Sequence, residues 1–192
     1  MDWEFRVLNY IKLHFKNSFM DFIMPVFSMP GTIVALWGLI TLISLIIKKH
    51  RPFGITMLLN LIISAVNCSL IIKPIVRRLR PYVMNDTINL IVRPEIDYSF
   101  PSGHTFFAFS AATICFIYNK AFGTAMYIVA FSIAFSRLYL YVHYPTDVLF
   151  GIIFGILTAI EVYYLEKYFL CDRVPLKDRK TVYFLRKTKA AE

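Results

Sequence analysis

Two long stretches of this sequence contain no charged residue, and this feature limits the possible folds more than any other. The first runs from Phe22 to Ile47 and the second from Pro52 to Ile72. A membrane-crossing helix needs about 20 mainly apolar residues. Only 17% of the chain is charged and 58% is hydrophobic, whereas soluble domains carry about 25% charged residues. We therefore expect lipid, rather than water, to surround much of this protein.

Three further apolar segments follow at roughly 103–119, 121–142 and 147–170, each separated by a short polar break. Together with the two earlier stretches they predict an all-α membrane helix bundle of five to six spans, built as a single domain over residues 1–192. Within the N-terminal segment 1–30, residues 3–19 mix apolar side chains with Arg6, Lys12, His14 and Lys16. This mixture favours an N-terminal interfacial helix that lies along the outer surface of the membrane.

The distribution of basic residues predicts the orientation of the chain, because cytoplasmic loops of membrane proteins are enriched in Lys and Arg. The cluster at 48–51 and the tail at 171–192, which has seven Lys or Arg against three Asp or Glu, are therefore expected in the cytoplasm. Alternation then places segment 73–102 outside, although it also carries five basic residues. An anionic ligand on the outer side would explain this exception, and we therefore expect one.

The tetrapeptide Pro101-Ser102-Gly103-His104 directly precedes an apolar run. It predicts the start of a helix with Ser102 near the N-cap. The free N–H groups and the dipole of a helix N-terminus bind anions, and glycine allows a phosphate to approach the backbone closely. Taken alone, the four residues suit a plain helix cap with an interfacial histidine equally well.

A second polar group surrounds His143. Ser136 and His143 are seven residues apart, which predicts one helical face in a helix ended by Pro145. Asp147 then lies in the first turn of the next span, where its carboxylate can accept a hydrogen bond from His143 and leave the other ring nitrogen as a nucleophile or base. The alternative is a His–Asp pair that only closes a short loop. Arg137, inside an apolar helix, favours an anion site.

A third polar group begins at Lys73, which the spacing places on one helical face with Arg77 and Arg80. Like charges on one face repel unless an anion joins them. We expect Lys73 and Arg80 to face a ligand. For Arg77 and Arg78 we expect the simpler role of reaching the lipid headgroups.

The three segments read K-x6-R-P, P-S-G-H and S-R-x5-H-x3-D, in this order. This pattern resembles that of the type 2 phosphatidic acid phosphatase family. The match extends from Lys73 to Asp147, and the apolar spans around it are similar to the membrane branch of that family rather than to its soluble acid phosphatases and vanadium haloperoxidases.

The resemblance implies a lipid phosphatase in which His143 attacks phosphorus to form a phosphohistidine while Asp147 orients it. His104 would protonate the leaving oxygen and afterwards assist water, and Ser136 would have a supporting role. The phosphoryl oxygens would be held by Lys73, Arg80, Ser102, Gly103 and Arg137. The resemblance implies no metal and no other cofactor. The expected location is the cell membrane, with the active site on its extracytoplasmic side and the C-terminus in the cytoplasm.

The expected partner is a phosphorylated lipid. Short bacterial members of this family, of the same shape as this chain, resemble undecaprenyl diphosphate phosphatases, which produce undecaprenyl phosphate. Many of those enzymes have Asp at the position of Gly103. Phosphatidylglycerophosphate and phosphatidate are the alternative substrates. We expect loop 82–98, with Asp86, Glu95 and Asp97, to contribute to headgroup selection.

A protein of a second class, a phospholipid carrier without hydrolysis, would use the same cradle of cations but would be expected to lack one or both histidines. The net charge of +9 alone would also suit a nucleic-acid partner. That partner is disfavoured because the basic residues are divided between two sides of the membrane and form no continuous stripe. None of these features predicts the oligomeric state.

Overall fold

The computed structural model of the chain describes residues 2–85 and 88–173, and all regular structure within them is helical, as predicted. Asp86 and most of the predicted basic tail, 171–192, lie outside these residues. The elements in chain order are α1 (Asp2–Phe15), α2 (Ser18–Ser28), α3 (Pro30–Ile46), the 3-10 helix η1 (Lys48–His50), α4 (Arg51–Ala65), the π-helix η2 (Val66–Ile72), α5 (Lys73–Val76), α6 (Pro81–Met84), α7 (Gly103–Tyr118), α8 (Lys120–Tyr139) and α9 (Pro145–Arg173).

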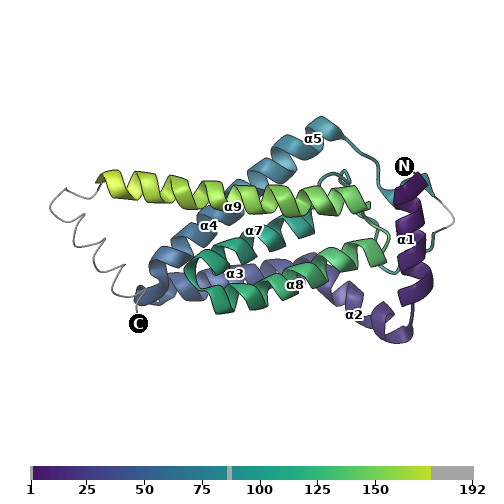
Figure 1. The fold of residues 1–192 in the computed structure, drawn as a ribbon, viewed down its shortest axis with the longest axis horizontal. Coiled ribbons are helices and arrows are strands. Elements are labelled where there is room, and N and C mark those ends of the chain that lie inside the picture. Colours follow the sequence, from purple (N-terminus) through teal and green to yellow (C-terminus); the bar gives the residue numbers. More distant parts are fainter. Residues whose placement is uncertain (1, 86–87, 174–192) are drawn as a thin grey trace.

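The longer helices α3, α4, α7, α8 and α9 run lengthwise through the bundle and alternate in direction (Figure 1). Three helical stretches are long and apolar enough to cross a membrane: Lys48–Met84, Lys120–Tyr139 and Pro145–Tyr168. Shorter apolar helices cover Ser18–Ser28, Ala35–Ile46 and Gly103–Tyr118. The total of five to six spans stays a prediction.

Two glycines on α9 allow this helix to approach α7 closely. A Cβ atom at Gly155 would lie only 2.5 Å from the carbonyl oxygen of Phe106, and one at Gly151 would lie 2.9 Å from that of Ser102. Small residues four positions apart favour such close packing of membrane helices. The contact brings the starts of both helices together, and the Ser102 N–H donates to the carbonyl oxygen of Asp147 at 3.0 Å.

Helix α1 lies across the end of the bundle at which α9 begins (Figure 1). Its Leu8 is completely buried in a cluster with Tyr141 and Tyr144, whereas Tyr10 and Leu13 are exposed. One face of α1 therefore covers the bundle and another is free to contact lipid. The interfacial position of this helix in a membrane stays a prediction.

The prediction that Ser136 and His143 share a helical face is wrong, because α8 ends at Tyr139. Tyr141 has a φ of 61°, in the left-handed region, and the chain turns there. His143 consequently lies in the loop between α8 and α9.

The prediction of one helical face for Lys73, Arg77 and Arg80 is also wrong. The π-helix η2 precedes Lys73, and α5 ends at Val76 because Arg77 has a left-handed φ of 50°. Arg80 lies beyond this helix, at the start of α6. Lys73 and Arg80 are buried, whereas Arg77 is exposed.

Candidate active site

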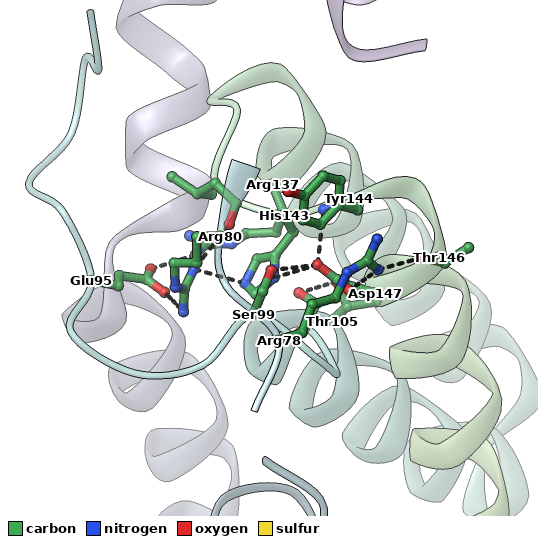
Figure 2. A network of polar contacts seen from close by, with 12 residues as sticks. Arg78, Arg80, Glu95, Ser99, Thr105, Arg137, His143, Tyr144, Thr146 and Asp147 are labelled. Carbon is green, nitrogen blue, oxygen red and sulfur yellow. Dashed lines mark hydrogen bonds and ion pairs between the residues drawn. The ribbon is translucent and has the colours of Figure 1, made fainter. Parts of the chain in front are cut away.

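The predicted site residues come from six parts of the chain and meet at the end of the bundle covered by α1. The loop before α9 supplies His143, and Figure 2 shows its ring between a group of arginines and Asp147. The other contributions are Lys73 from α5, Arg80 from the start of α6, Ser102 to His104 from the start of α7, Arg137 from the last turn of α8, and Asp147 from the first turn of α9.

The surroundings of His143 indicate which of its ring nitrogens carries the proton. Arg80 Nη1 lies 3.2 Å from His143 Nε2. Because a guanidinium can only donate, Nε2 accepts this hydrogen bond and the proton lies on Nδ1. Nδ1 is 3.5 Å from Asp147 Oδ2. The lone pair of Nε2 therefore faces the basic side of the site, and the protonated nitrogen faces the carboxylate.

His143 is also held in its neutral form. Its side chain is completely buried, and this burial, together with the charges of Arg80 and Arg137, lowers the pKa of His143 well below its ordinary value. A neutral imidazole with one unprotonated nitrogen is the form that can act as a nucleophile or base.

Asp147 is buried and accepts hydrogen bonds on both carboxylate oxygens. Oδ2 accepts from Ser99 Oγ at 2.5 Å and from the Tyr144 N–H at 2.9 Å, in addition to facing His143. Oδ1 accepts from Arg78 Nη1 at 2.6 Å. These contacts fix the carboxylate in one orientation behind the histidine ring.

Three cations gather on the other side of His143. Arg80, Arg137 and Lys73 are only 2%, 1% and 6% exposed, so their charges require nearby anions. Two carboxylates of the loop before α7 supply them. Glu95 pairs with both Arg80 and Arg137, and Asp97 pairs with both Lys73 and Arg80.

These ion pairs keep both loop carboxylates ionised. Burial raises the pKa of Glu95, but the charges of Arg137 and Arg80 outweigh this effect and lower that pKa to about 2. Burial likewise raises the pKa of Asp97, and Lys73 and Arg80 reverse the effect to a net lowering. Glu95 and Asp97 therefore stay negatively charged and bind the N–H groups of Lys73, Arg80 and Arg137. A bound phosphoryl group would need the same N–H groups.

A cavity of about 410 Å³ adjoins this cluster. Its polar wall includes Lys73, Glu95, Asp97 and His104, and its apolar wall is formed by Trp37, Leu61 and Phe107. His104 Nε2 is buried and has no hydrogen-bond partner among the described residues. The cavity thus joins charged groups and a free imidazole nitrogen to a surface suited to hydrocarbon.

Ser102 and Gly103 lie at the start of α7, as predicted, but the two residues differ in their surroundings. Ser102 is the N-cap, but its hydroxyl pairs with Thr105 Oγ1 at 2.9 Å and makes no hydrogen bond to the helix backbone. Gly103 lines the cavity, and a Cβ atom there would lie 3.9 Å from Lys73 Nζ. Among the described residues, no group of three or more His, Cys, Asp or Glu is arranged to hold a metal ion.

Several residues of the site have roles that their sequence positions did not predict. Arg78 does not extend toward headgroups: its side chain is 17% exposed and binds Asp147, Thr146 and Glu4. Glu4 is 143 positions from Asp147, and no local spacing relates the two. Ser99 lies just before the tetrapeptide at 101–104, where a residue pattern gave no reason to assign it to Asp147.

The model of the PAP2 superfamily matches residues 51–171. Over 152 residues, the chain is 29% identical to the undecaprenyl-diphosphatase of Sulfolobus acidocaldarius, covering 79% of this chain and 71% of that protein. Over 85 residues, it is 36% identical to the Bacillus licheniformis "bacitracin transport permease protein BcrC", and this match covers 44% of this chain and only 42% of the relative.

A third relative is the undecaprenyl-diphosphatase BcrC of Bacillus subtilis, 30% identical over 111 residues, or 57% of this chain and 54% of the relative. Among solved structures, the fold is similar to that of a PAP2-type phosphatidylglycerolphosphate phosphatase from Bacillus subtilis. The TM-score is 0.72 at 22% identity, with 87% of this chain and 86% of the other covered. Aquifex aeolicus LpxE gives a TM-score of 0.70 at 24% identity, with 83% and 94% covered.

Proposed function

The chain belongs to the PAP2 superfamily, and on this premise we propose that it is an integral membrane lipid phosphatase that converts undecaprenyl diphosphate to undecaprenyl phosphate. The observation that carries the proposal is the arrangement around His143: Nε2 lies 3.2 Å from Arg80 Nη1, and Arg80 is linked to the buried Arg137 and Lys73 through Glu95 and Asp97. On the other side of the ring Nδ1 faces Asp147, and His104 lies in an adjoining cavity with an apolar wall. The family membership and the chemistry of these groups point to phosphoryl transfer.

In the proposed reaction, His143 Nε2 attacks the terminal phosphorus while the bond from phosphorus to the leaving oxygen breaks. His104, proposed to be protonated while the anionic substrate is bound, gives its proton to that oxygen and becomes neutral, and the lipid product leaves with one phosphate. Water then attacks the phosphohistidine, His104 takes a proton from the water, and inorganic phosphate leaves. Asp147 stabilises the positive charge that His143 gains in the covalent intermediate.

Lys73, Arg80 and Arg137 are proposed to stabilise the phosphoryl oxygens, with Gly103 and the N–H groups at the start of α7 completing the cradle. Ser102 is proposed to contribute through its position at this helix start. The phosphoryl group must take over donors from Glu95 and Asp97, which is how these two residues would influence headgroup selection. The positive charge of the cradle comes from side chains, so we expect hydrolysis to continue in EDTA.

The choice of substrate rests on the relatives named undecaprenyl-diphosphatase, which are 29% and 30% identical to this chain. Phosphatidylglycerophosphate and phosphatidate remain the alternatives. We propose that the site end of the bundle faces the extracytoplasmic side, since the basic cluster at 48–51 belongs to the opposite end, where α3 turns into α4 (Figure 1).

The decisive experiment is a phosphate-release assay with the full chain purified in detergent, offered undecaprenyl diphosphate, farnesyl diphosphate, phosphatidylglycerophosphate and phosphatidate. We expect release from the diphosphates, no release after His143→Ala, and a slow or trapped phosphoenzyme after His104→Ala. An inactive wild-type protein that still binds these lipids would overturn hydrolysis in favour of a carrier. Strong inhibition by EDTA would contradict the proposed source of charge.

A further inference from the structure

Arg78 connects helix α1 to the carboxylate behind His143. Its Nη1 donates to Asp147 Oδ1 and to Thr146 Oγ1, both at 2.6 Å, and its Nη2 donates to Glu4 Oε2 at 2.6 Å. The other oxygen of Glu4 accepts from Thr146 Oγ1 at 2.6 Å. The guanidinium also lies 3.9 Å from the centre of the Tyr144 ring. Figure 2 shows Arg78 beside Asp147, on the side away from Arg80.

Burial strengthens the electrostatic interactions among Arg78, Glu4 and Asp147. The side chains of Asp147, Glu4 and Arg78 are 0%, 5% and 17% exposed, so water screens them only weakly. Glu4 belongs to α1, outside the residues 51–171 that the family model matches. Glu4, in the first turn of α1, thus completes a network of charges that runs through Arg78 and Asp147 to His143, the proposed nucleophile.

We propose that Arg78 and Glu4 are positioning residues for the His143–Asp147 pair, with Arg78 fixing the carboxylate and Glu4 balancing the charge of Arg78. The inference rests on the proposed function. It assigns to α1 a part in the chemistry besides its contact with lipid.

The balance follows from the proposed reaction. His143 gains a positive charge when its Nε2 bonds to phosphorus, and Asp147 stabilises that charge. The cation of Arg78, bound to the same carboxylate, works against this stabilisation. Glu4 offsets Arg78, so that the guanidinium still fixes the Asp147 carboxylate, with one nitrogen on each of the two carboxylates, while its electrostatic effect on His143 is reduced.

The test compares Arg78→Gln, Glu4→Gln and the double variant with two matched controls, Arg77→Gln and Asp2→Asn. Arg77 and Asp2 are exposed residues that carry the same charges in the same two segments. With farnesyl diphosphate in detergent, we expect kcat to fall by up to about 100-fold in Arg78→Gln and by about 10-fold in Glu4→Gln, with KM changed less than about threefold. Both controls should retain wild-type kinetics.

The double variant separates a shared role from two independent ones. If Glu4 acts by balancing Arg78, the double variant is at least as active as Arg78→Gln alone, a non-additive result. The inference would be overturned if the fold-losses in kcat of the two single variants multiplied in the double variant. It would also be overturned if the variants lowered only the amount of folded protein and left kcat unchanged. Thermal unfolding of every variant is measured to separate these cases.

A second readout does not depend on turnover. The chain has four histidines, so ¹⁵N-histidine labelling gives a tractable NMR spectrum in which His143→Ala identifies the His143 signals. We expect the Nδ1 proton of His143 to shift upfield or broaden in Arg78→Gln and Glu4→Gln, and to be unchanged in the controls. Unchanged signals in all variants would overturn the positioning role. Changed signals in a protein that hydrolyses none of the lipids would preserve it and reject the proposed function.

Discussion

At the scale of single residues, the neutral state of His143 has a direct effect on the pH dependence of activity. Burial and the charges of Arg80 and Arg137 place the pKa of His143 well below 6.5. Loss of activity from protonation of this ring therefore begins only well below pH 6.5. We expect kcat/KM for farnesyl diphosphate to show no acid limb near pH 6.5 in the wild-type protein.

Arg80→Gln provides the matching test, because it removes the cation that lies 3.2 Å from His143 Nε2. Its removal raises the pKa of His143, so the acid limb of the remaining activity should move to higher pH. The same acid limb in both proteins would show that another group controls the profile.

Glu95 gives a second prediction at this scale. Its carboxylate pairs with Arg80 and Arg137 and competes with any phosphoryl oxygen for the same donors. Glu95→Gln should therefore strengthen inhibition by orthovanadate, lowering its inhibition constant by about 10-fold, equivalent to about 1.4 kcal/mol. The measurement is a vanadate titration of phosphate release, with Asp2→Asn as the exposed control. Weaker inhibition in Glu95→Gln would mean that Glu95 serves mainly to hold the arginines in place.

At the scale of helices, the close approach of α7 and α9 holds Gly103 and His104, at the start of α7, near Asp147, in the first turn of α9. Gly155→Ala would place a methyl group 2.5 Å from the backbone oxygen of Phe106, which cannot move without shifting α7. We expect a loss of about 1–3 kcal/mol in the free energy of unfolding. The midpoint of thermal unfolding in detergent measures it. Gly31→Ala is the control, because nothing lies within 4 Å of the added methyl there. Equal midpoints would contradict close packing at Gly155.

The helices also show what could be predicted from sequence. Apolar runs located α7, α8 and α9 to within about three residues at each end, since the length of an apolar run is a local property. The first uncharged run, 22–47, covers part of α2 as well as α3, and the second, 52–72, covers α4 and η2. The early ends of α5 and α8 could not be predicted in this way. Arg77 and Tyr141 adopt left-handed conformations without being Gly or Asn, so their residue types carry no turn signal.

The same distinction applies to the site. His143, Asp147 and the cations could be singled out as polar residues next to apolar runs, in an order and spacing that resemble a known family, and the structure brings them together. Glu4, Ser99 and the ion pairs of Glu95 depend on contacts between distant segments, which no spacing rule describes.

At the scale of the whole molecule, the two ends of the bundle differ in what they carry, and this makes the proposed orientation testable. Ile96 is fully exposed in the loop before α7, whereas Lys49 is exposed at the opposite end of the bundle. In a Cys171→Ser background, we expect a membrane-impermeant maleimide to label Ile96→Cys in intact cells, and Lys49→Cys only after lysis. Cys68 and Cys115 are buried and should not react. The reverse labelling pattern would invert the orientation.

The cavity beside His104 has a consequence for the direction of the proposed reaction. Its wall of Trp37, Leu61 and Phe107 suits a hydrocarbon chain, whereas Asp97 at its polar end is half exposed to water. The two products would therefore leave into different phases, the lipid into the bilayer and inorganic phosphate into water. Once separated in this way they rarely meet again, and hydrolysis becomes effectively irreversible without any input of energy beyond the cleaved bond.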